Sequence, residues 1–276
     1  MADGVVITSM REASEEITDA KVADVKSLFD THVNDGKVIV VVEGPDDKEV
    51  YQKVMDANAV CFYVDCNCDK HFVILNALNN KYGNRLLAIK DADFDRLDGT
   101  ANPYPNMMLT DTHDMEGMIV SECLSELQGD DAVRCQGINL ADIYAELEDV
   151  SYLKWFNHVN HYGINFSETT LDLNINAYFS ACIANTKKSV SVTLADMYTF
   201  KSANPRVPKK ELCNGHDIFE RIYVRAKAAN TANYAKKPFF RRLRRAYPRD
   251  SFVNTVLFRA IKAWEASNNQ AILAVA

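Results

Sequence analysis

Three pairs of acidic residues stand where a folded sheet could gather them at one edge. Each pair falls at the end of a predicted strand or the start of a predicted helix: Glu43 with Asp47, Asp91 with Asp93, and Asp114 with Glu116. Carboxylates that lie close together raise one another's pKa values unless a cation neutralises them. Oxygen ligands of this kind suit Mg²⁺ or Mn²⁺. We therefore expect a metal site, where two ions about 4 Å apart could support phosphodiester cleavage.

Each pair alone is a weak signal, because acidic residues are common at strand ends. The run from Asp91 to Asp95 also resembles a calcium loop, but Arg96 stands where such a loop needs glycine. A phosphatase of the Asp-x-Asp type would carry its pair on the first strand, followed by Thr or Val, and here Phe94 and Asp95 intervene. The metal prediction therefore rests on the three pairs taken together.

The elements that must position these acids are typical of a parallel α/β sheet. Residues 38–42 are β-branched or otherwise apolar, as in a strand buried on both faces, and Glu43 follows them. Further elements alternate along the chain: strands over 59–64, 85–90 and 107–109, and helices over 45–55 and 70–82. If the first and third strands are neighbours, the acids meet at the carboxyl edge of the sheet, where open α/β sheets bind ligands.

The predicted fold class is therefore α/β, a Rossmann-like parallel sheet flanked by helices and followed by a mostly helical region. We expect a helical segment over 1–34, an α/β domain over 35–128 and a helical, basic region over 129–276. Residues 152–162 are aromatic and ambiguous in structure, and His158 within them is expected to pack. A final helix is predicted with Asp250 or Ser251 as its cap.

Two other histidines precede an acid and open a predicted helix. They are His113, before Asp114, and His216, before Asp217. The backbone N–H groups at a helix start attract phosphate, which favours a role in substrate binding. A lone histidine at such a position is more often structural, so both interpretations stay open.

The net charge of −7 hides an asymmetry along the chain. From residue 201 onward there are 16 Lys and Arg against 5 Asp and Glu. The basic residues concentrate in one run: Lys236, Lys237, Arg241, Arg242, Arg244 and Arg245. Together with Phe239, Phe240 and Tyr247 they could follow a phosphate backbone and stack on bases. The alternatives are a solvated basic face, or a face that docks on acidic residues of this chain or a partner.

Seven cysteines, an odd number with irregular spacing, occur in a chain of 276 residues. A chain of this length buries a core without disulfide bonds, so we expect a reducing, cytoplasmic setting. No apolar run approaches the length of a membrane span, and the N-terminus lacks a signal-peptide pattern. The sequence predicts no membrane partner.

The motifs resemble those of TOPRIM nucleases of the OLD-like group. The residues that carry the resemblance are Val-Glu-Gly-Pro-Asp-Asp at 42–47, Lys-Asp-Ala-Asp-Phe-Asp at 90–95, the segment from Thr110 to Glu116, and Asn-Gly-His-Asp at 214–217. The likeness is strongest over residues 35–125. Within the group, the chain is most similar to the stand-alone TOPRIM effectors (the AriB type) encoded beside ABC-type ATPases in PARIS anti-phage loci.

This resemblance implies a Mg²⁺-dependent endonuclease that cuts DNA or RNA such as tRNA. It makes Glu43 the catalytic acid or base, or a metal ligand, and makes Asp91 and Asp93 catalytic metal ligands, with Asp47 and Glu116 completing a second metal position. It also implies an ABC-type ATPase partner that controls a toxic effector, and possible action as a homodimer. The competing expectations are a TOPRIM-like regulatory or scaffold subunit without turnover, and an enzyme acting on small phosphate esters.

Overall fold

The computed structural model describes residues 19–63, 78, 81–99, 104, 106–228 and 235–274. The chain divides into two compact units, each built from separate segments. The first unit comprises Met1–Asp91, Asn102–Thr110 and Tyr247–Ala276, and the second unit comprises Ala92–Ala101 and Asp111–Ala246. The chain therefore passes between the units at Asp91, between the two members of the Asp-x-Asp pair.

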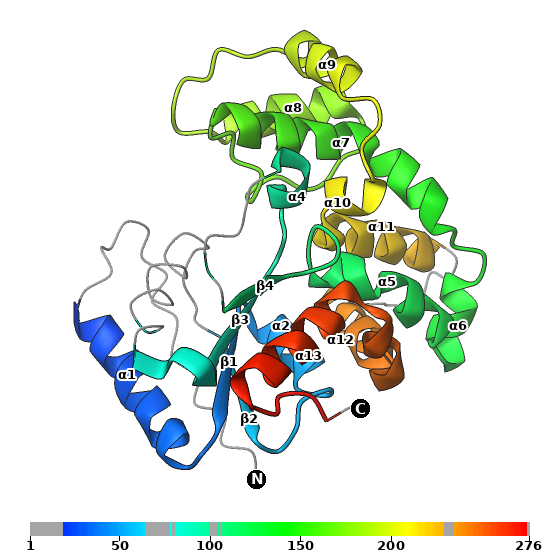
Figure 1. The fold of residues 1–276 in the computed structure, drawn as a ribbon. Coiled ribbons are helices and arrows are strands. Elements are labelled where there is room, and N and C mark those ends of the chain that lie inside the picture. Colours follow the sequence, from blue (N-terminus) through cyan, green and yellow to red (C-terminus); the bar gives the residue numbers. More distant parts are fainter. Residues whose placement is uncertain are drawn as a thin grey trace. The chain divides into compact units, whose positions relative to one another are not determined.

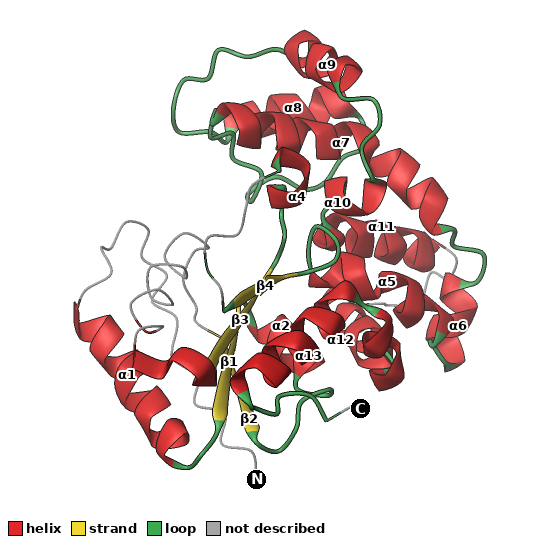
Figure 2. Ribbon diagram, viewed as in Figure 1, coloured by secondary structure: helices red, strands yellow, loops and turns green. Residues whose placement is uncertain are grey.

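The first unit holds a parallel sheet of four strands among the described residues. They are β1 (Val38–Val42), β2 (Ala59–Tyr63), β3 (Leu86–Lys90) and β4 (Met107–Leu109). Their order is β2-β1-β3-β4, so β1 and β3 are central neighbours, with Val41 beside Ala88. The predicted α/β class and all four predicted strands are confirmed, with β2 ending at Tyr63 where its described residues end (Figure 2). An all-parallel sheet needs cover on both faces, which explains why β1 is apolar throughout.

Helices cover both faces of this sheet (Figure 1). On one side, Ile39 and Val41 pack in a buried cluster with Phe29 of α1 (Asp19–Asn34) and with Tyr82. On the other side lie α2 (Pro45–Tyr51) and α13 (Val256–Asn268). Side chains of a strand alternate between faces, so β1 feeds both layers of the core.

The last described residues of the first unit fold back onto it. Beyond α13, Leu273 pairs with Met55 in an antiparallel bridge, and Asp56 donates its backbone N–H to the Ile272 carbonyl at 2.7 Å. We call residues 269–274 the hook. The buried Glu265 accepts hydrogen bonds from the backbone N–H groups of Ile272 and Leu273 in the hook, at 2.6 and 2.7 Å. A charge-assisted pair of hydrogen bonds therefore anchors the tail.

The regular secondary structure of the second unit is helical in its described residues. Its helices are α4 (Asp95–Asp98), α5 (Met115–Ser125), α6 (Gly129–Cys135), α7 (Leu140–Asn160), α8 (Ile175–Ala184), α9 (Leu194–Ala203), α10 (Lys209–Leu212), α11 (Gly215–Ala228) and α12 (Lys236–Ala246). Leu153 and Phe156 of α7 centre its core, with Tyr178 of α8 and Met197 of α9 packed around them.

Several local predictions need correction. The aromatic segment 152–162 is helical as far as Asn160, the last residue of the continuous helix α7, because Tyr152, Trp155 and Phe156 face the core at helical spacing. The final helix begins at Val256 with Thr255 as its cap, after a 3-10 turn, η2 (Arg249–Asn254), so the predicted cap at Asp250 or Ser251 is wrong. Of the helix predicted over 70–82, residues 70–77 and 79–80 lie outside the described part of the chain.

Candidate active site

Glu43 and Asp91 meet at the carboxyl ends of the two central strands. Glu43 directly follows β1 and Asp91 directly follows β3, and Glu43 Oε1 accepts the Asp91 backbone N–H at 3.1 Å. In the sheet, β2 lies on one side of β1 and β3 lies on the other. The strand order therefore reverses between β1 and β3, and the carboxyl ends of these two strands form the topological switch point of the sheet. Open α/β sheets bind ligands in the crevice at such a point.

Asp47 has a structural role in the first unit. It is buried in the first turn of α2, and its Oδ2 accepts the backbone N–H of Gly44 at 2.8 Å. This bond closes the corner between β1 and α2 and favours the negative charge at a helix start. Asp47 therefore holds the residue that follows Glu43, which is a role that the sequence did not reveal.

Asp93 lies in the second unit, in a turn with an unusual backbone. Its φ is +46°, a left-handed conformation that few residues other than glycine adopt. The turn is held because Asp93 donates its backbone N–H to the His113 carbonyl at 2.6 Å, while the His113 backbone N–H bonds to the Lys210 carbonyl at 2.9 Å. The Asp93 side chain keeps 39% of its surface exposed and lies 4.0 Å from His113 Nε2.

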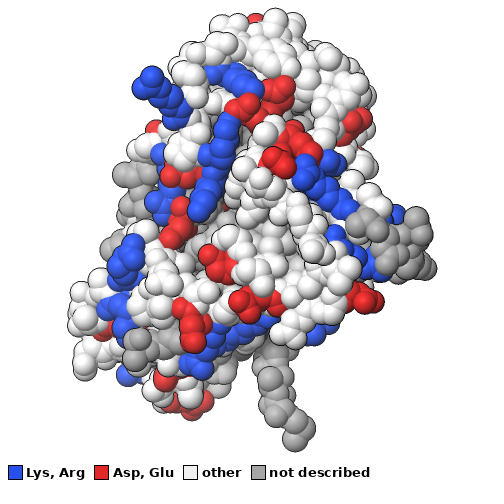
Figure 3. Space-filling model, turned by 90° about the vertical axis from the view of Figure 1, so that its right-hand side faces the viewer, with Lys and Arg blue, Asp and Glu red and all other residues white. Residues whose placement is uncertain are grey.

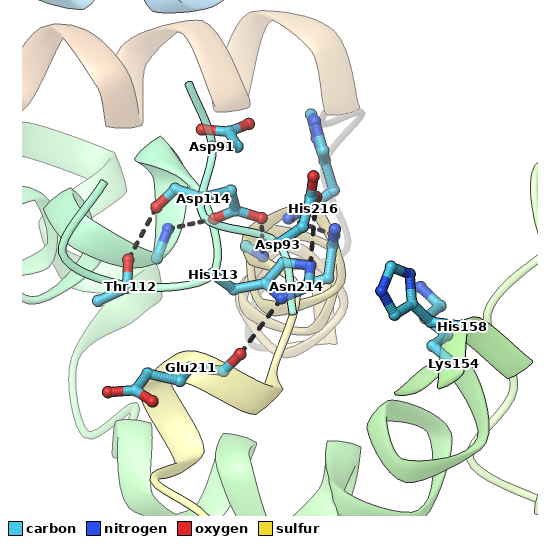
Figure 4. Close-up of polar contacts among 12 residues, drawn as sticks. Asp91, Asp93, Thr112, His113, Asp114, Lys154, His158, Glu211, Asn214 and His216 are labelled. Atoms are coloured by element: carbon cyan, nitrogen blue, oxygen red, sulfur yellow. Dashed lines mark hydrogen bonds and ion pairs between the residues drawn. The ribbon is translucent and has the colours of Figure 1, made fainter. Parts of the chain in front are cut away.

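His113 is a buried residue that the structure orients closely (Figure 4). Its Nδ1 faces the Glu211 carbonyl at 3.3 Å, and its ring meets the Phe94 ring edge-on at 4.7 Å. Burial lowers the pKa of His113, so the neutral imidazole is favoured, with Nδ1 as donor to the carbonyl. The His113 side chain is a buried part of the fold and also a neighbour of Asp93. Its environment therefore agrees with both open interpretations, a structural role and a role in substrate binding.

Asp114 links the starts of two helices (Figure 4). Its side chain caps α5 by accepting the Gly117 backbone N–H at 2.8 Å, and it accepts the Gly215 backbone N–H at the start of α11 at 2.5 Å. Burial first, and then the nearby charge of Glu116, raise the pKa of Asp114 to about 7. Gly215 permits this approach, since a Cβ there would lie 2.2 Å from Asp114 Oδ1 and 2.6 Å from the Gly117 nitrogen.

Glu116 is engaged by a basic residue far along the chain. Arg244 of α12 donates to Glu116 Oε1 from Nε at 3.1 Å and from Nη2 at 2.7 Å. Both side chains are almost fully buried, and the Arg244 guanidinium also lies over the Phe219 ring. In this arrangement Glu116 neutralises an arginine, whereas the sequence resemblance made it a metal ligand. His216 is largely exposed, with Nδ1 4.0 Å from the same oxygen of Glu116.

The structure adds residues of α7 to the surroundings of Asp93. His158 is not packed away as expected; 43% of its side chain is exposed, its Nε2 lies 3.1 Å from Asp98 Oδ2, and its ring meets the Phe94 ring at 5.3 Å. Lys154, one turn earlier, donates to Asp217 Oδ2 at 2.5 Å. The four-residue spacing of Lys154 and His158 was visible in the sequence, but it points to a shared face only once that segment is known to be helical.

Several residues of the basic run form ion pairs within the second unit. Lys236, Arg242 and Arg244 pair with Glu220, Asp131 and Glu116 of the same unit. This is the docking of a basic face on acidic residues of the same chain, and Figure 3 shows Lys and Arg side chains lying beside Asp and Glu on the face it presents. Lys237, Arg241 and Arg245 have exposed side chains at four-residue spacing on α12.

The aromatic residues of this run belong mainly to the core. Phe239 and Tyr247 are buried, and the Phe240 ring packs edge-on against the Phe219 ring at 5.6 Å. The expectation that Phe239 and Tyr247 stack on bases is therefore wrong, because their hydrophobic surface is used in folding.

Across the described ranges, no three or more Asp, Glu, His and Cys side chains are gathered closely enough to hold a metal ion. Mg²⁺, however, is commonly held by one or two carboxylates, with waters and substrate phosphate completing its shell. Glu43 and Asp91 fit that smaller requirement, because one backbone-to-side-chain bond joins them at the switch point. Asp114 is committed to backbone N–H groups, and Glu116 to Arg244.

No known family model matches the chain, and no curated protein matches its sequence significantly. Among the helices of the described residues, none is long and apolar enough to cross a membrane.

Proposed function

We propose that the protein is a metal-dependent endonuclease whose catalytic centre is built on Glu43 and Asp91 of the first unit. The observation that carries this proposal is the hydrogen bond from the Asp91 backbone N–H to Glu43 Oε1. It joins two acidic residues at the one point of the sheet where α/β proteins of this topology bind ligands. A nucleic acid phosphate is the substrate group that combines with such acids through Mg²⁺ or Mn²⁺.

The acidic residues in this region can provide the carboxylate ligands that such a metal site needs. Glu43 and Asp91 would hold the ion from the first unit, and Asp93 follows two residues along the chain with a partly exposed carboxylate. The ion would supply the polarisation of a phosphate oxygen and the activation of water. The His113 backbone holds the Asp93 turn in its left-handed conformation, and such strained turns are found at functional sites.

The finer family assignment is part of the same proposal. A parallel sheet with an acid after its first strand and an Asp-x-Asp after its third supports a TOPRIM-like nuclease of the OLD-like group. The toxic defence effector controlled by an ABC-type ATPase partner follows from that resemblance. A homodimer, and the choice between DNA and RNA, are proposed on the same basis alone.

One observation favours a second candidate function, a TOPRIM-like regulatory or scaffold subunit. Glu116 is neutralised by Arg244, so it is engaged within the fold. A module that has lost turnover would keep the sheet and its acids without completing the ion site.

The Glu43→Gln variant separates these functions. We expect it to lose cleavage of plasmid DNA, single strands and tRNA in Mg²⁺ or Mn²⁺, with its melting temperature kept. Asp30→Asn is the matched control, because Asp30 is an acid of the same unit that pairs with Lys81. Cleavage by Glu43→Gln at the parent's rate would exclude the nuclease. A panel of nucleotides tests phosphate-ester hydrolysis, and a crystal soaked in Mn²⁺ should show density beside Glu43 and Asp91.

A further inference from the structure

Two basic side chains share one face of α7 close to Asp93. Lys154 and His158 are separated by four residues, so they lie one helical turn apart. Figure 4 shows both projecting from α7 on the side where Asp93 and His113 lie. The Phe94 ring touches both histidine rings, at 4.7 Å from His113 and 5.3 Å from His158. Phe94, which follows Asp93 in the chain, therefore lies between the His113 and His158 rings.

His158 is oriented by a carboxylate that is itself fixed. Asp98 Oδ2 lies 3.1 Å from His158 Nε2, and Asp98 Oδ1 accepts the Trp155 indole N–H at 2.8 Å. Trp155 and His158 thus hold both oxygens of Asp98, the last residue of the single-turn α4. A side chain fixed through its supporting partners is what a binding site requires. The same contacts dock the segment that follows Asp93 onto α7.

Lys154 keeps donor capacity beyond its ion pair. An ammonium group carries three N–H donors, and among the described residues Asp217 Oδ2 takes one at 2.5 Å. Its side chain is 18% exposed, so the charge is only partly screened by water. The Lys154 ammonium therefore places a positive charge on the face of α7 that it shares with His158.

We propose that Lys154 and His158 form a phosphate-binding pair in the second unit, which holds a phosphoryl group of the substrate beside Asp93. The proposal rests on the nuclease function and adds the residues that bind the substrate's charge. A phosphate offers several acceptor oxygens, so it can take hydrogen bonds from an ammonium and an imidazole together. Asp98 and Asp217 keep the two donors in place before the ligand arrives.

Titration with inorganic phosphate tests the pair directly. In the full chain, the His158 imidazole ¹⁵N resonance should shift saturably as phosphate is added. Lys154→Gln removes the charge but keeps a donor to Asp217, and it should raise the apparent Kd about tenfold, the loss expected for one charged hydrogen bond. Lys201→Gln is the matched control. Like Lys154, Lys201 forms ion pairs with acidic side chains, in its case Glu148 and Asp149 of α7. It should change the Kd less than about twofold, as surface pairs contribute little.

The proposal is overturned if phosphate does not shift His158 saturably in the parent, or if Lys154→Gln binds phosphate as tightly as the parent. Should Lys154→Gln fail to fold, His158→Asn, at a more exposed position, replaces it, with phosphate binding followed by calorimetry. The result is independent of the nuclease test. Loss of cleavage in Glu43→Gln without any phosphate shift would refute the pair alone, whereas a shift with unimpaired cleavage in Glu43→Gln would refute the nuclease alone.

Discussion

Arg244 and Glu116 form a buried ion pair that joins α12 to α5. The guanidinium donates twice to one carboxylate oxygen, and the two side chains are only 5% and 3% exposed. The pair shows how a basic run that looks suited to nucleic acid can serve folding instead. It also fixes the position of an acid that the sequence placed at the metal site.

Removal of one partner of this pair should destabilise the protein strongly. Arg244→Met leaves the Glu116 carboxylate buried without its partner, which typically costs about 3–5 kcal/mol. Arg225→Met breaks a more exposed pair with Glu146 and should cost about 1 kcal/mol or less. Urea unfolding of both variants measures the difference. Equal losses would show that the Arg244 pair is no more important than a surface pair.

Gly215→Ala should destabilise the contact between α5 and α11. The new Cβ would lie 2.2 Å from Asp114 Oδ1 and 2.6 Å from the Gly117 backbone nitrogen, and we expect a cost of about 1–3 kcal/mol from overpacking. Gly117→Ala is the control on the neighbouring helix. Its nearest contact is the Thr112 hydroxyl at 3.1 Å, and the gain in helix propensity of up to about 1 kcal/mol should offset the crowding. Unchanged stability in Gly215→Ala would contradict the close approach.

Asp114 should make stability depend on pH. Its pKa is raised from 3.8 to about 7, so between these values the folded protein binds a proton that the unfolded chain does not. Stability from this group is therefore greatest in acid and is lost as the pH rises through about 7. Relative to Asp114→Asn, the parent should lose melting temperature as the pH rises from about 4 to about 7, with no further loss above that range. Parallel curves for the two proteins would mean that Asp114 titrates normally.

Lys237, Arg241 and Arg245 should govern the salt dependence of nucleic acid binding. Each phosphate contact contributes about 0.7–0.9 to the slope of log K against log salt, so changing all three to Gln should reduce the slope by about 2–3. The charge-matched control is Lys201, Lys209 and Arg225 to Gln, since these three basic residues of the second unit lie outside α12. Fluorescence anisotropy in the Glu43→Gln background measures both. Equal slopes for the two triple variants would assign the contacts elsewhere.

The sheet was predictable because its signals are local. Residues 38–42 and 86–90 are short apolar runs, and both form central strands as expected. Their adjacency, which joins Glu43 to Asp91, was a condition in the sequence argument and is confirmed by the pairing of β1 with β3. The pattern also predicted β4 from three residues, because Met107–Leu109 stands between turn signals.

The surroundings of Asp93 were not predictable, because they depend on contacts between distant residues. Asp114 meets Gly215 and Glu116 meets Arg244 across more than a hundred residues, and nothing in either segment alone indicates the partner. The face shared by Lys154 and His158 was hidden because the aromatic residues left the structure of 152–162 ambiguous. In both cases tertiary packing decides what local sequence leaves open.

The hook in which Leu273 pairs with Met55 bears on how the chain folds during synthesis. The first unit takes segments from both sides of the second in sequence, and α13 supplies Trp264, whose indole N–H bonds to Asn106 of that unit at 2.9 Å. On the ribosome, the strands therefore emerge long before the helix that covers one of their faces. We expect the sheet to expose apolar surface to chaperones until α13 has left the ribosome, and proteolysis during translation can measure this delay.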